Sequence, residues 1–219
     1  MGKDDPAGPA GPKPDLDALL ERLGGTGPLL ERLARAQAAL DRERADAPGL
    51  CSELLALPRE QQPERAAGDP RFHTWGLSEE LLRRGLETAE ADPREAARLA
   101  ELALTASARL DAELHATPLL QDLEARIWAC LGDVRLRTGD LPGAEEALRE
   151  AALRLARGTG DLLVEARLLE FEAAVRKAQA RPREAAALLK QAEARYREVN
   201  EPEMAARVRR ERDQLLQAP

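Results

Sequence analysis

Histidine and cysteine, the side chains most often used for nucleophilic or metal chemistry, are scarce in this sequence of 219 residues. Neither His73 nor His115 has a cysteine, serine or acidic residue at a recognisable catalytic spacing. Cys51 and Cys130 are too few and too isolated for a disulfide scaffold or a zinc site. Acidic residues are abundant, but no spacing singles out a pair for acid–base chemistry. We therefore expect no enzymatic activity, no metal and no cofactor.

One glycine-rich stretch, Gly24-Gly25-Thr26-Gly27, precedes a helical pattern that begins at Pro28. Glycines at the N-terminus of a helix can form a phosphate-binding site. Here no strand pattern precedes the glycines, and no lysine–threonine pair follows them. The stretch is therefore expected to be a linker.

The composition argues against several classes of function. The net charge of −7 disfavours general nucleic-acid binding, and aromatic residues at 2% leave few rings for base stacking. No stretch approaches the roughly 20 apolar residues of a membrane span. Residues 1–14 lack the apolar core of a secretory signal. We expect a soluble, cytoplasmic protein that binds neither nucleic acid nor membranes.

Two consecutive helix–loop–helix units between Leu119 and Tyr196 match each other at a fixed offset. Apolar residues in them recur every three or four positions and so share one helical face. Five residue pairs are each separated by 41 positions: Leu123 and Val164, Ile127 and Leu168, Val134 and Val175, Ala144 and Ala185, Ala151 and Ala192. Asp161 is placed to cap the third helix. A fixed period across two helices indicates a helical repeat array.

The first unit carries an ordered set of aromatic, leucine, small, turn and alanine residues. The set is Trp128, Leu131, Gly132, Gly139, Asp140, Ala144, Leu148 and Ala151. This order resembles the tetratricopeptide repeat. The second unit departs from it at Glu172, where a leucine is expected, and both units have an arginine, Arg135 and Arg176, at the usual tyrosine position. The period also exceeds the usual one of about 34. The resemblance implies an all-α fold: a right-handed α-solenoid of antiparallel helix pairs that binds other proteins.

In a tetratricopeptide array, the first helix of each pair lines the concave side, so the resemblance implies that charged residues on these helices contact a partner. The candidates are Arg126, Asp133, Arg137, Arg167, Glu170 and Lys177. The cations suit an acidic or carboxylate-bearing protein or peptide, because arginine binds carboxylates through paired hydrogen bonds. The alternative is an ordinary solvated surface. The lysine–asparagine carboxylate clamp of chaperone-binding relatives is absent.

Four segments are expected along the chain. Residues 1–14 form a disordered tail rich in proline and glycine. Residues 15–68 form short helices with a break at Pro48-Gly49 and a solvated charged face that includes Glu43 and Arg44. The pattern restarts after them with an N-cap and a first-turn proline at Asp69-Pro70. Residues 69–200 form about three repeat pairs. Residues 201–219 form a capping helix with Arg207, Arg209, Arg210 and Arg212 pointing outward.

Phe72 and Trp75 have two possible roles. They form either a hydrophobic plug at the end of the array or an exposed aromatic patch for a partner. For the whole chain, the leading hypothesis is a protein-interaction scaffold with a concave groove. The alternative is a regulatory sensor, in which the array binds a signal peptide or a partner domain and residues 15–68 act as an effector module. Self-association into a homo-oligomer is compatible with both hypotheses.

Overall fold

The computed structural model describes residues 26–111 and 114–217, and within these ranges it is entirely helical, without a strand. The α-helices are α2 (Thr26–Ala56), α3 (Gln62–Gly68), α4 (Trp75–Thr88), α5 (Pro93–Ser107), α6 (Thr117–Arg137), α7 (Leu141–Leu155), α8 (Leu162–Ala178), α9 (Pro182–Glu198) and α10 (Pro202–Gln217). Two 3₁₀ helices, η1 (Arg59–Gln61) and η2 (Pro70–Phe72), join them. The all-α class is confirmed for this part of the chain. The expectations for residues 1–25 lie outside the described residues.

The chain divides into two compact units, residues 1–39 and residues 40–219. The described part of the first unit is the beginning of α2, where the side chains of Leu30 and Leu33 are exposed. The second unit contains the remainder of α2 and all the other described helices. The candidate site lies within this second unit.

Helix α2 continues through Pro48, so the predicted break at Pro48-Gly49 is wrong. Proline lacks the N–H that would donate to the carbonyl of Arg44, and it normally kinks or ends a helix. Ala47 and Cys51, on either side of the proline, are buried, and the hydroxyl of Ser52 donates to the carbonyl oxygen of Pro48 at 2.8 Å. Packing on both sides of the proline therefore offsets the lost backbone hydrogen bond.

Glu43 and Arg44 of α2 both contact α4. Glu43 is partly buried there, contrary to the predicted solvated face, whereas Arg44 remains exposed. The carboxylate of Glu43 accepts a hydrogen bond from the backbone N–H of Trp75 at 2.6 Å, at the first turn of α4. Nε of Arg44 donates to the carboxylate of Glu79 at 2.8 Å. These two contacts attach the second half of α2 to the start of the helical pairs.

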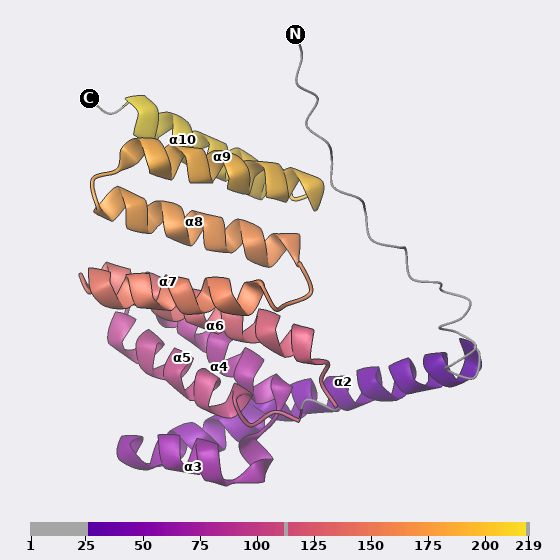
Figure 1. Cartoon of the computed structure of the whole chain (residues 1–219). Helices are drawn as coiled ribbons and strands as arrows, with labels where there is room; N and C mark the ends of the chain where they lie inside the picture. Colours follow the sequence, from indigo (N-terminus) through magenta and orange to yellow (C-terminus); the bar gives the residue numbers. More distant parts are fainter. Residues whose placement is uncertain (1–25, 112–113, 218–219) are drawn as a thin grey trace. The chain divides into compact units, whose positions relative to one another are not determined.

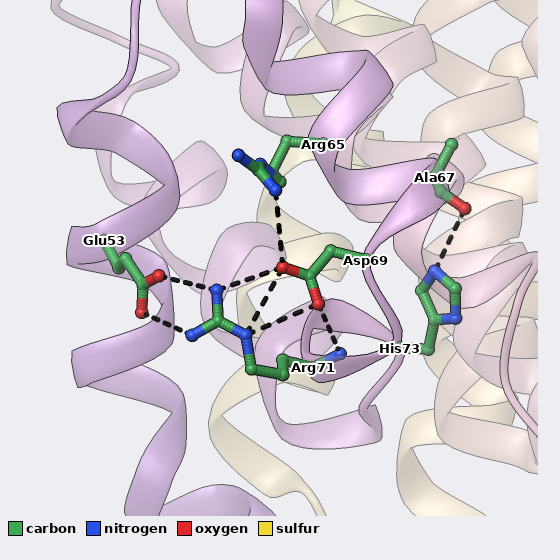
Figure 2. Close-up of polar contacts among 6 residues, drawn as sticks. All are labelled: Glu53, Arg65, Ala67, Asp69, Arg71 and His73. Carbon is green, nitrogen blue, oxygen red and sulfur yellow. Dashed lines mark hydrogen bonds and ion pairs between the residues drawn. The ribbon is translucent and has the colours of Figure 1, made fainter.

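Asp69 is an N-cap as predicted, but it caps the short helix η2, and the next α-helix begins at Trp75. Its carboxylate accepts from the backbone N–H of Arg71 at 3.1 Å (Figure 2). The guanidinium of Arg71 binds both Asp69 and Glu53 of α2, the latter at 2.9 Å. Figure 2 also shows Nε2 of His73 beside the carbonyl oxygen of Ala67, at 3.1 Å. This network fixes the chain between α3 and α4.

Consecutive helices pack in pairs: α4 with α5, α6 with α7, and α8 with α9. Each pair also contacts the next, through α5 with α6 and α7 with α8, and α10 packs on α9 (Figure 1). All ten residues of the five pairs separated by 41 positions are buried. The side chains of Asp140 and Asp161 cap α7 and α8. The packing is consistent with a helical repeat.

Helix α10 covers α9 but does not point all its arginines outward. Ala205 and Val208 are buried in a cluster that contains Tyr196 of α9. Arg212 lies 2.6 Å from the carboxylate of Glu193. Arg207 forms an ion pair with Glu170 of α8. The prediction of a solvated arginine face is therefore wrong for Arg212, which is largely covered, whereas Arg207 remains exposed although it meets an acidic residue of α8.

Candidate partner-binding groove

A groove of about 580 Å³ runs along the first helices of the successive pairs. Its lining comes from α4, α6, α8 and α10, together with Tyr196 of α9. These four helices alternate in the chain with the second helices α5, α7 and α9. Each of the three helix pairs of the second unit therefore contributes side chains to the same groove.

Five of the six charged residues singled out from the sequence line this groove: Arg126, Asp133, Arg137, Arg167 and Glu170. Lys177, the sixth, is exposed on the last turn of α8 and does not belong to the lining. The sequence-based selection missed the contributions of α4 and α10, including Leu82, Leu86, Met204, Arg207 and Glu211. Arg207 follows Arg167 by 40 positions, close to the repeat period, and this signal could have identified it.

The floor of the groove is apolar. Leu82, Val164 and Phe171 are buried there, while Leu86 stands at the rim with 52% of its surface exposed. Gly132 makes the floor possible, because a Cβ at this position would lie 2.2 Å from Cζ of Phe171. The absence of a side chain at Gly132 of α6 thus lets the ring of Phe171 pack closely against α6.

Arg137 is neutralised within its own helix. Its Nε lies 2.7 Å from the carboxylate of Asp133, one turn earlier in α6. The hydrogen bond and the negative charge of Asp133 raise the pKa of the Arg137 guanidinium. This pair is about half exposed, so it contributes little to stability. Both groups nevertheless have a partner before any ligand arrives.

A second polar cluster in the groove lining joins three helices. Glu170 of α8 accepts a hydrogen bond from the hydroxyl of Tyr196 and forms an ion pair with Arg207 of α10. Tyr196 is fully buried, and burial together with the bond to Glu170 raises the pKa of its hydroxyl. The cluster fixes the position of α10 relative to α8 and α9.

Arg126 and Arg167 are less engaged than these residues. Nη1 of Arg126 lies 4.0 Å from Glu79, whose carboxylate is already bound by Arg44. Burial raises the pKa of Glu79, but the hydrogen bond from Arg44 and the nearby positive charges outweigh it, so the pKa lies below its ordinary value. Arg167 is exposed and makes no hydrogen bond or ion pair with any residue in the described ranges.

The predicted aromatic patch does not exist as a surface. Phe72 is 1% exposed and Trp75 is 9% exposed, and both belong to the core formed by α2, α4, α5 and α6. Trp75 packs at 5.6 Å between ring centroids against His115, which follows α5. Phe72 and Trp75 are therefore part of the hydrophobic core, as the interpretation of a hydrophobic plug expected.

The two cysteines are buried thiols. Burial raises the pKa of both thiols. For Cys130, which lines the groove, it raises the pKa to about 12. Across the described ranges, no group of three or more histidine, cysteine and acidic side chains is arranged to hold a metal ion. The described helices include none with the length and apolar character needed to cross a membrane.

No family model, curated protein or solved structure matched this chain.

Proposed function

We propose that this protein is an interaction scaffold of tetratricopeptide type, a right-handed α-solenoid that binds a segment of a partner protein in the groove. The observation that supports the proposal is the origin of the lining. The first helices of three successive pairs, together with α10, contribute to one surface, as in a solenoid whose first helices face inward. Grooves between stacked helices commonly accept extended peptides or partner helices.

The chemistry of the lining fits a polypeptide ligand. Buried apolar side chains form the floor, the half-exposed Leu86 borders it, and charged side chains surround it. An apolar centre with a polar rim is the usual composition of a protein-binding surface. Exposed Leu86 is then covered when the partner binds.

Filling the groove tests the proposal. Ala174 of α8 lines the groove, whereas Ala187 of α9 is exposed and lies outside it. A library of random peptides is displayed, and the members that bind the immobilised wild-type chain are selected. The peptides have about 16 residues, roughly five more than an average α-helix. We expect them to bind wild type and Ala187→Trp equally, and Ala174→Trp about tenfold more weakly, because the indole occupies the groove.

Circular dichroism and thermal unfolding verify that both variants are folded. Selection of no peptide at all, or equal binding to wild type and Ala174→Trp, overturns the proposal that the groove is the binding surface.

A further inference from the structure

Three arginines occupy equivalent positions along the groove. Arg126 of α6 and Arg167 of α8 are 41 residues apart, which is the repeat offset. Arg167 and Arg207 are both the sixth residue of their helices, because α8 begins at Leu162 and α10 at Pro202. All three line the groove. We name Arg126, Arg167 and Arg207 the arginine row.

The members of the arginine row differ in how far their charge is already satisfied. Arg207 is paired with Glu170. Arg126 has only the distant Glu79, which Arg44 binds more closely at 2.8 Å. Arg167, in the centre, has no acidic partner among the described residues. The row therefore presents its available positive charge on α6 and α8.

The carboxylates of the lining are distributed in the opposite way. Asp133 is engaged by Arg137, and Glu170 by Arg207 and Tyr196. Glu211 of α10 forms no ion pair within the described part of the chain and disfavours an anion at that end. An anionic group is thus favoured over α6 and α8 and disfavoured near the C-terminal half of α10.

We infer that the ligand of the groove is an acidic polypeptide segment, in which one carboxylate binds Arg167, a second lies toward Arg126, and an apolar side chain covers Leu86. This inference rests on the proposed function and specifies its partner. Arginine binds a carboxylate through two parallel hydrogen bonds, which favours Asp or Glu at this point. Packed helices lie about 8–10 Å apart, a distance that three residues of extended chain span. The two acidic residues are therefore expected about three positions apart.

Lys177 provides a matched control. It lies on the same helix as Arg167, is exposed, carries the same charge and lies outside the groove. The peptides selected on the wild-type chain are sequenced, and their affinities for Arg167→Glu, Arg167→Gln and Lys177→Glu are measured by fluorescence polarisation. We expect enrichment of Asp and Glu over the unselected library. We also expect Arg167→Glu to weaken binding about tenfold or more, and Lys177→Glu about twofold or less.

Charge exchange completes the test. Each acidic residue of the best peptide is replaced in turn by Lys. The replacement of the residue that binds Arg167 should weaken binding to the wild-type chain and restore binding to the Arg167→Glu variant. Selected peptides that are basic or uncharged, or equal losses for Arg167→Glu and Lys177→Glu, overturn the acidic-segment inference. If Ala174→Trp still blocks those peptides, the groove proposal stands without it. Selection of a sequence from this chain itself would identify a second copy as the ligand, and it supports the inference only if that sequence is acidic.

Discussion

Ala180 has the same left-handed backbone conformation as Gly139, which lies 41 residues earlier. The φ angle is 57° at Ala180 and 82° at Gly139. The N–H of the following residue, Arg181 or Asp140, donates to the carbonyl of Arg176 or Arg135, at 2.9 Å in both cases. The first helices of the two helix pairs thus end in the same type of turn. Only the first of these turns has the glycine that its positive φ favours.

Ala180→Gly should stabilise the protein. Removing the Cβ relieves the unfavourable positive φ, and we expect the free energy of unfolding to rise by about 0.5–1 kcal/mol after the added backbone entropy is included. Urea denaturation followed by circular dichroism measures the change. Ala187→Gly, at an exposed position inside α9, is the control and should lower stability by about 1 kcal/mol. A loss of stability in both variants would contradict the assignment of strain to Ala180.

Gly132→Ala should destabilise the protein through Phe171. The new Cβ would lie 2.2 Å from Cζ of Phe171 and 3.0 Å from Cβ of Ala147, so the ring must move. Overpacking of this kind costs about 1–3 kcal/mol. In the double variant with Phe171→Leu, the combined loss should be smaller than the sum of the two single losses, since the shorter side chain leaves room for the methyl group. Strict additivity in urea denaturation would show that the two residues do not clash.

Asp122→Ala should loosen the connection between α7 and α8. The buried carboxylate of Asp122 accepts from the backbone N–H of Thr159 at 3.0 Å and from its hydroxyl at 2.6 Å. Without it, a backbone donor loses its partner, and we expect a loss of about 1–3 kcal/mol. Thr159→Ala removes only the hydroxyl bond and should cost less. Hydrogen exchange of the backbone amide at position 159 should accelerate in Asp122→Ala and hardly change in Thr159→Ala.

The stabilisation provided by Glu79 should depend on pH. Because the pKa of Glu79 is lower in the folded protein than its ordinary value of 4.5, the carboxylate stabilises the fold at pH values above 4.5. This contribution is lost as the pH falls through the lower, folded pKa. The difference in unfolding free energy between wild type and Glu79→Gln should thus be constant near neutral pH and vanish in acid. Arg44 is half exposed, which limits the difference to about 1 kcal/mol.

Glu101→Gln is the control for this titration. Glu101 is exposed on α5, and it makes no ion pair with the other described residues. Because its substitution removes no ion pair, the unfolding free energy near neutral pH should change little. A pH-independent difference for Glu79→Gln would mean that Arg44 does not favour the charged form of the carboxylate.

The sequence by itself determined the all-α class and many of the buried positions, and it predicted a repeat with which the helix packing is consistent. Helix faces follow from residues three and four positions apart, and the cap at Asp161 follows from a side chain beside the first turn. The offset of 41 residues also located buried positions correctly, because equivalent residues of successive pairs meet equivalent neighbours. The resemblance to the tetratricopeptide repeat implied that Arg126 and Arg167 share one surface, and both line the groove.

Only the tertiary structure decided where packing between helices prevails over the local sequence pattern. Pro48 lies within a helix because packing on both sides compensates for its missing hydrogen bond, and Phe72 is covered by helices distant in the chain. The ion pair between Arg207 and Glu170 spans 37 residues and removes one arginine from the available charge. Local periodicity fixes the direction of a side chain on its own helix. The partner that this side chain meets depends on how separate helices pack, so the charge available in the groove emerges only in three dimensions.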